Sequence, residues 1–204
     1  MNISTRRVVV FIDAANVYER FKELYCRPPY QMADGQFDPM KLGRLLVARG
    51  PAAEPWTLSE VRAYTGRPNA NLQRASASAH GKQVAAWRKA GAIVCERDLQ
   101  YLDWPQKPPR QKGVDVELAA HLIRMARKDY DIAIVASGDT DLLPAIETVY
   151  ETRGTQDTPR VCVVGYTGFP KRLRLRDTRG PVLYCFYISA EDYAAISDPV
   201  DYTT

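Results

Sequence analysis

Aspartates follow two apolar runs of the chain directly, and their type and spacing suit metal chemistry. Asp13 comes after RVVVFI (7–12), and Asp139 and Asp141 come after IAIVAS (132–137). Carboxylates that gather in a small space raise one another's pKa unless a positive group neutralises them. A hard divalent cation such as Mg²⁺ or Mn²⁺ is the natural partner, because it prefers oxygen ligands. The pattern therefore predicts a divalent-cation site.

A fourth carboxylate, Asp115, falls in the first turn of a helix expected over Val114–Lys128. At about 100° per residue, Leu118 and Leu122 lie on nearly the same side of that helix, so Asp115 is expected at the edge of its buried stripe. Taken alone, Asp115 could simply compensate the helix dipole. Its position beside the strand-end aspartates makes it a further candidate ligand.

Capping is the alternative explanation for the other polar residues. Asp13 and Asp139 could each cap the helix that follows, and so could Asn16. Asn16 could also hold an aspartate carboxylate in place by a hydrogen bond. Ser137 and Gly138 allow a tight turn with a hydroxyl near a metal or a phosphate. A functional site is favoured because all of these residues fall at strand ends.

Short β-branched runs alternate with helical patterns along the chain, which is typical of a parallel sheet covered on both faces. We therefore expect an α/β fold, a three-layer αβα sandwich with a mainly parallel, Rossmann-like sheet. Strands are expected at 7–12, 61–64, 92–95, 132–136, 161–164 and 182–188, and helices at 16–25, within 72–89, at 114–128, at 142–152 and after Ser189.

The sheet decides whether the aspartates meet. In an open parallel sheet, ligands bind beyond the carboxyl ends of the strands, where the strand order reverses. If the first and fourth strands are neighbours, Asp13, Asp139 and Asp141 converge on one crevice. Two Pro-rich polar loops, 26–39 and 102–113, flank these segments, and loops of this length are usually functional or disordered.

Length and composition exclude several classes of protein. The chain has 204 residues, 46% of them hydrophobic and 25% charged, which excludes general disorder. We expect one domain over 1–204, with the motifs within about 7–165 and a basic segment, a last strand and a short helix over 166–204. The longest apolar stretch near the start, Val8–Ile12, is too short for a membrane span or a signal peptide. We expect a cytoplasmic protein with no membrane contact.

The four cysteines (Cys26, Cys95, Cys162 and Cys185) form no CxxC pair, and three of them lie in apolar runs. Buried thiols in a reducing compartment are expected. A zinc site would need cysteines and histidines clustered at short spacings, and the chain has two histidines.

Basic residues gather in the loop before Asp115 and again over 171–176. The net charge of +4 permits a polyanionic partner without requiring one, since a basic run is also an ordinary solvated surface. Backbone charges and base–aromatic stacking hold single-stranded nucleic acid, and Tyr101 and Trp104 are candidate platforms. The candidate nucleic-acid contacts are Lys107, Arg110, Lys112, Ser137, Lys171, Arg172, Arg174 and Arg176.

Three segments, VFIDAANV (10–17), KGVDVEL (112–118) and SGDTDLLP (137–144), together resemble the NYN domain family of LabA-like proteins, in the PIN-like nuclease superfamily. The resemblance covers about residues 7–165. It implies a Rossmann-like sandwich with an acidic pocket that binds Mg²⁺ or Mn²⁺ and cuts RNA, single-stranded or structured. By position, the family's catalytic site matches Asp13, Asn16, Asp115, Asp139 and Asp141, and the four aspartates among them are the expected metal ligands.

The chain departs from the family at one position. The family's KGxDVxLxxD pattern has an aspartate where this chain has His121, which falls within the buried stripe of its helix. His121 could be a packed histidine or a contact to metal or phosphate. The substitution leaves open a second interpretation, in which a catalytically weak NYN module binds RNA or a protein partner.

Two other classes fit less well. A haloacid-dehalogenase-type phosphatase would need a DxD pair after the first strand, where this chain has Asp13-Ala14-Ala15. A dinucleotide-binding role would need a GxGxxG after that strand, which is missing. The apolar final strand, VLYCFYI (182–188), could complete the sheet or pair with a second copy as an exposed edge, so a homodimer is also a candidate arrangement.

Overall fold

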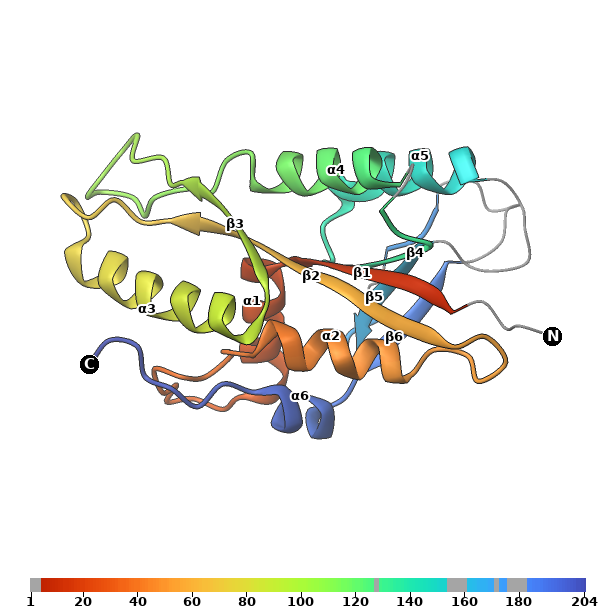
Figure 1. Cartoon of the computed structure of the whole chain (residues 1–204). Helices are drawn as coiled ribbons and strands as arrows, with labels where there is room; N and C mark the ends of the chain where they lie inside the picture. The colour runs from red at the N-terminus through yellow and green to blue at the C-terminus, as the bar shows by residue number, and fades with distance from the viewer. Residues whose placement is uncertain (1–4, 127–128, 154–160, 171–172, 176–182) are drawn as a thin grey trace.

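A parallel sheet forms the centre of the molecule, with its strands in the order β3-β2-β1-β4-β5-β6 (Figure 1). The computed structural model describes residues 5–126, 129–153, 161–170, 173–175 and 183–204. The order reverses between β1 and β4, which pair directly. The expected α/β sandwich with a parallel, Rossmann-like sheet is confirmed. The strands are β1 (Arg6–Asp13), β2 (Trp56–Arg67), β3 (Ile93–Asp98), β4 (Ile132–Ala136), β5 (Val161–Tyr166) and β6 (Tyr184–Ile188).

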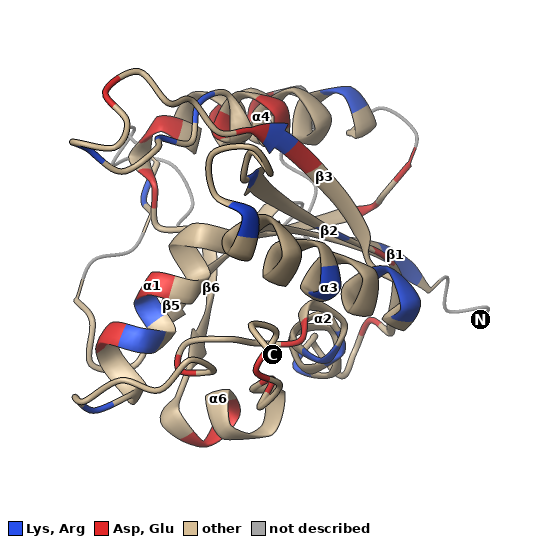
Figure 2. Cartoon of the chain, turned by 90° about the vertical axis from the view of Figure 1, so that its left-hand side faces the viewer, with Lys and Arg blue, Asp and Glu red and all other residues tan. Residues whose placement is uncertain are grey.

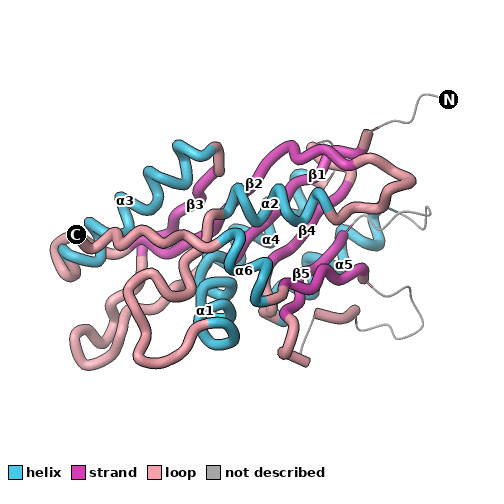
Figure 3. Tube along the Cα trace, turned by 90° about the horizontal axis from the view of Figure 1, so that it is seen from below, coloured by secondary structure: helices cyan, strands magenta, loops and turns pink. Residues whose placement is uncertain are grey.

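Helices cover both faces of the sheet (Figures 1 and 3). Successive side chains of β1 point to opposite faces: Val8 and Val10 join one core cluster, and Val9 and Phe11 join the other. All four are fully buried, which explains why the run is apolar without alternation. The first face carries α1 (Ala14–Tyr25), α2 (Pro39–Ala48), α3 (Arg74–Ala90) and α6 (Ala190–Ile196), and the second carries α4 (Val114–Met125) and α5 (Leu143–Arg153).

Helix α2 was not predicted, although its local signals are present. The side chain of Asp38 caps the helix by accepting hydrogen bonds from the backbone N–H of Met40 (2.7 Å) and Lys41 (3.1 Å). Pro39 opens the first turn, where its missing N–H costs nothing. Leu42 and Leu46, one turn apart, are fully buried. An aspartate cap, an N-terminal proline and apolar residues at helical spacing would have identified this helix.

The expected elements are otherwise present with shifted ends. Strand β2 is longer than predicted at both ends, because residues 56–58 and 60 also pair with β1 and residues 65–67 pair with β3. Helix α1 begins at Ala14 rather than Asn16, and α4 ends at Met125. Strand β6 completes the sheet beside β5. Of the helices in the described ranges, none has the length and apolar character that crossing a membrane requires.

Candidate functional site

Asp13 stands where β1 ends and α1 begins, and it is both a cap and a site residue. Its Oδ1 accepts the backbone N–H of Asn16 (3.2 Å), and its Oδ2 accepts the hydroxyl of Ser137 (3.0 Å). Burial raises the pKa of Asp13. The two hydrogen bonds oppose this, while the charges of Asp139 and Asp115 raise the pKa further. The carboxylate therefore lies in a place where a positive ligand would be favourable.

The turn after β4 is tied to the start of α1. The side-chain oxygen of Asn16 accepts the backbone N–H of Gly138 (2.8 Å). Ser137, which is fully buried, accepts the N–H of Asp139 (3.1 Å) while donating to Asp13. Asp139 in turn caps a 3-10 turn, η1 (Thr140–Leu142), by accepting the N–H of Asp141 (2.9 Å). These bonds fix the distance between the two strand-end aspartates.

A cleft of about 480 Å³ opens at this strand reversal. Asp13 from β1, Asp115 from α4 and Asp139 from the turn after β4 all line it, so three of the four predicted carboxylates are brought together. Residues of α1 form one wall of the cleft. Both acidic and basic residues lie along this helix (Figure 2). The other lining residues are Ala15, Asn16, Glu19, Arg20, Gln111 and Val114.

Gly113 sets the position of Asp115. The backbone φ of Gly113 is 80°, in the left-handed region that residues with a side chain rarely adopt. Gly113 immediately precedes α4. A Cβ at this position would meet nothing within 4 Å, so backbone conformation rather than crowding requires the glycine. The turn at Gly113 starts the helix at Val114, and the first helical turn then carries Asp115 to the cleft.

Some predicted residues lie elsewhere. Asp141 is exposed in η1 and is not among the residues that line the cleft, so its role as a ligand stays a prediction. Ser137 has no exposed surface, which corrects the expectation that it touches nucleic acid: its hydroxyl positions Asp13. Lys112 is exposed on the loop beside the cleft.

The other basic candidates are spread over the surface. Lys107 and Arg110 are exposed, and Lys107 pairs with Asp103 (3.0 Å). Arg174 is also exposed and follows Leu173, which is buried in the core. Lys171, Arg172 and Arg176 lie outside the described residues.

Two charged residues of the cleft, Glu19 and Arg20, were not predicted. They lie three and four positions after Asn16, on the same side of α1, and this helical spacing is the signal that would have found them. The guanidinium of Arg20 lies 4.1 Å from the ring centroid of Phe169 and pairs with Glu23. A cation fixed in this way at the edge of the cleft is suited to a phosphate group.

His121 faces a different part of the molecule. Its Nδ1 lies 3.0 Å from the hydroxyl of Tyr64, and it is not among the residues that line the cleft. It stands six residues after Asp115, about 9 Å further along the helix axis. Burial and the nearby Arg124 and Arg62 lower the pKa of His121.

A second group of metal-capable side chains surrounds His121, and sequence reasoning missed it. The sulfur of Cys95, a carboxylate oxygen of Glu117 and a ring nitrogen of His121 lie within 4.8 Å of one another. However, Arg97 already pairs with Glu117 (2.8 Å), and burial raises the pKa of Cys95. A cation there would have to displace an arginine and ionise a disfavoured thiol.

The donor set of the cleft is the better fit to a hard divalent cation. Its donors are carboxylate oxygens from Asp13, Asp115 and Asp139, and the side-chain oxygen of Asn16, which also lines the cleft, accepts the backbone N–H of Gly138. Mg²⁺ and Mn²⁺ prefer such ligands. Burial, and then the charges of Asp139 and Asp115, raise the pKa of Asp13, and a cation among the three carboxylates would favour its charged form.

Comparisons with known proteins agree with this fold. The chain is similar to a solved protein of unknown function, VPA0982 from Vibrio parahaemolyticus RIMD 2210633, with 18% identity and a TM-score of 0.52 over 79% of this chain and 82% of that chain. At that identity the likeness concerns the fold alone. The comparison with curated proteins gave no match. A family model of the NYN domain matches residues 7–174, most of the chain, and the protein therefore belongs to the NYN domain family.

Proposed function

We propose that this protein is a metal-dependent endoribonuclease that hydrolyses phosphodiester bonds of RNA. The observation that carries the proposal is the convergence of Asp13, Asp115 and Asp139 on one cleft at the reversal of strand order. Membership of a family that resembles the PIN-like nucleases supports the same reaction class.

Each residue of the cleft has a part in this proposal. Asp13, Asp115 and Asp139 would hold Mg²⁺ or Mn²⁺, with Asp141 as a further candidate. The chemistry that such an ion supplies when bound is the activation of water and the stabilisation of charge on the phosphodiester oxygens. Ser137 and Asn16 position the carboxylate of Asp13 and the turn that carries Asp139. Arg20 would bind a phosphate of the substrate.

RNA, in single-stranded form, is the proposed substrate because the family resemblance favours it over DNA. The exposed Lys112, Arg110 and Lys107, on the loop beside the cleft, would extend the backbone contacts of Arg20. We place the reaction in the cytoplasm, because the four cysteines are free and such thiols persist in reducing compartments.

The position of His121 bears on the alternative, a catalytically weak module that binds RNA or protein. That interpretation rested on a histidine in place of the family's aspartate. Since His121 packs against Tyr64 and lies outside the lining of the cleft, the substitution leaves all three carboxylates of the cleft in place. The enzyme is therefore the better-supported proposal.

The proposal is tested by cleavage of end-labelled single-stranded RNA with Mn²⁺, Mg²⁺ or EDTA, together with Mn²⁺ binding by calorimetry. The variants are Asp13→Asn, Asp115→Asn and Asp139→Asn. We expect the wild type to cut RNA only when metal is present. Each variant should lower the cutting rate by at least about 100-fold, because loss of a ligand should cost at least as much as loss of a residue that only orients a ligand. Each variant should also weaken Mn²⁺ binding.

Two control variants make the result specific to the cleft. Asp129→Asn removes an exposed carboxylate outside it, and Cys95→Ser disables the second metal-capable group. Both should cut and bind Mn²⁺ like the wild type. Cutting that survives all three cleft substitutions would overturn the proposed site. Mn²⁺ binding without cutting would establish the binding module instead.

A further inference from the structure

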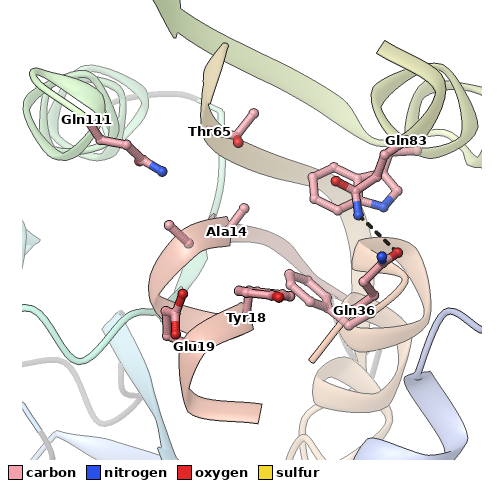
Figure 4. A pocket seen from close by; sticks show the side chains of 10 residues that line it. Ala14, Tyr18, Glu19, Gln36, Thr65, Gln83 and Gln111 are labelled. Carbon is pink, nitrogen blue, oxygen red and sulfur yellow. Dashed lines mark hydrogen bonds between the residues drawn. The ribbon is translucent and has the colours of Figure 1, made fainter. Parts of the chain in front are cut away.

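A second hollow, of about 320 Å³, lies beside the acidic cleft. It opens between the first turns of α1, the end of β2 at Thr65 and the inner side of α3 (Figure 4). Ala15, Glu19 and Gln111 line both hollows, so the two share a wall. A ligand that extends out of the acidic cleft on this side would enter the second hollow.

The lining of the second hollow favours a neutral, planar, polar ligand. Glu19, which it shares with the acidic cleft, carries the one formal charge of its lining in the described ranges, and it has no cation there that would bind a phosphate, whereas the neighbouring cleft contains Arg20. The hydrogen-bonding groups include the amides of Gln36, Gln83 and Gln111 and the hydroxyls of Thr65 and Tyr18. Aromatic surface comes from the rings of Tyr18, Phe37 and Trp87. Aromatic surface stacks on a nucleobase, and amides both donate and accept hydrogen bonds at its edge.

Several of these polar groups have hydrogen-bonding capacity to spare. The side-chain N–H of Gln36 donates to the carbonyl of Met32 (2.9 Å), and its side-chain oxygen accepts a long hydrogen bond from the amide of Gln83 (3.4 Å). Within the described ranges no partner is found for the amide of Gln111 or the hydroxyl of Thr65. In Figure 4 the side chains of Gln111, Thr65 and Gln83 point into the same space above Tyr18.

The indole N–H of Trp87, which lines the second hollow, is a buried hydrogen-bond donor. Trp87 is 5% exposed, and its indole N–H is buried without a hydrogen-bond partner in the part of the chain that the structure describes. An unpaired buried donor is unfavourable, so a lining amide that turns toward the indole when a ligand binds would be favoured.

We propose that the second hollow binds one nucleobase of the substrate, that of a nucleotide next to the scissile phosphate. This inference rests on the proposed ribonuclease function. The acidic cleft would hold the phosphate, and the amides and aromatic rings beyond the shared wall would hold the base, which gives the enzyme a base preference at one position beside the cut.

Two variants that touch the second hollow and not the acidic cleft test the proposal. Gln83→Leu and Thr65→Val remove hydrogen-bonding groups with little change of volume. The substrate is a pool of RNAs randomised on both sides of a fixed position, with the products sequenced. We expect the wild type to show a base preference at one position, and each variant to flatten it about tenfold, the lower range for a lost base contact. Gln31→Leu, at an exposed glutamine outside both hollows, should keep the preference.

A second measurement does not depend on cutting. Binding of the four nucleosides, of their 5′-monophosphates and of a short RNA is followed by ligand-observed NMR in Asp13→Asn, which we expect to be inactive, and in the same chain with Gln83→Leu. A base-dependent signal that Gln83→Leu removes supports the subsite even if the chain cuts no RNA. Cutting by the wild type with an unchanged base preference in both variants would overturn the subsite and leave the ribonuclease intact. Tighter binding of a free nucleotide than of RNA would assign the hollow to a free nucleotide and overturn it as an RNA subsite.

Discussion

The side-chain oxygen of Asn16 accepts the backbone N–H of Gly138 at 2.8 Å, joining two turns that lie 122 residues apart in the sequence. This bond holds the turn after β4, with Asp139, against the first turn of α1, with Asp13 next to it. Asn16 matches the family's site by position, and in the structure its side chain positions the turn that carries Asp139.

Replacing Asn16 should therefore change the geometry of the site more than the stability of the fold. We expect Asn16→Ala to reduce RNA cutting about 10- to 100-fold, the range for residues that orient metal ligands. The free energy of unfolding should fall by about 0.5–1.5 kcal/mol, the value of one hydrogen bond. Asn16→Asp keeps the accepting oxygen and should recover most of the activity. If Asn16→Asp is as inactive as Asn16→Ala, the positioning role is wrong.

Asp13→Asn should stabilise the metal-free protein while abolishing its activity. Because the folded-state pKa of Asp13 is raised, the folded chain loses stability as the pH rises through the window between the ordinary aspartate pKa, about 3.9, and the raised value. Asparagine has no such titration and remains a good N-cap. Thermal melts in EDTA should give Asp13→Asn the higher Tm at pH 7–8, with the difference vanishing near pH 4.

Mn²⁺ should reverse that order. A ligand that binds the folded state raises its stability, so Mn²⁺ should raise the Tm of the wild type and leave Asp13→Asn nearly unchanged. A lower Tm for Asp13→Asn at pH 8 in EDTA would show that its carboxylate is stabilising, against the expectation from its environment.

Two glycine substitutions should have opposite effects on stability. Gly113→Ala forces a side chain into the left-handed region and should cost about 1–2 kcal/mol, measured by urea denaturation. Gly81→Ala, within α3 with nothing within 4 Å of the new Cβ, should stabilise by about 0.5–1 kcal/mol. Gly113→Ala should also lower the cutting rate, because it displaces the first turn of α4 with Asp115. Equal stability changes for the two variants would contradict the conformational argument.

Arg20→Ala should weaken the binding of RNA and leave the rate of the chemical step nearly unchanged. We expect KM for RNA to rise about tenfold. The slope of binding affinity against salt concentration, on logarithmic scales, should fall by about one, the value of one lost phosphate contact. Arg20→Lys should restore the charge but only part of the affinity, since lysine lacks the planar group that lies over Phe169. Arg44→Ala, at an exposed arginine on α2, is the matched control and should leave the salt slope unchanged. An unchanged KM for Arg20→Ala would remove Arg20 from the substrate site.

Local pattern was enough for much of this protein. The apolar runs predicted the strands of the buried sheet, and three motif segments carried the family resemblance that the match over residues 7–174 confirms. Helix α2 and the cleft residues Glu19 and Arg20 were missed, yet their signals are local: an Asp38-Pro39 start, and helical spacing from Asn16. Hydrophobic periodicity and helix capping depend on residues only a few positions apart, so they can be identified in a single sequence.

The contacts between segments far apart in the sequence were decided by the tertiary structure alone, because they depend on the order and register of the strands. The sequence carries no local sign that β1 lies beside β4, which is why the bond from Asn16 to Gly138 could not be foreseen. The same holds for the approach of Cys95 to His121, and for the position of His121 outside the cleft. These contacts join segments 26 to 122 residues apart, and they form only when packing of the whole sheet has fixed which strands are neighbours.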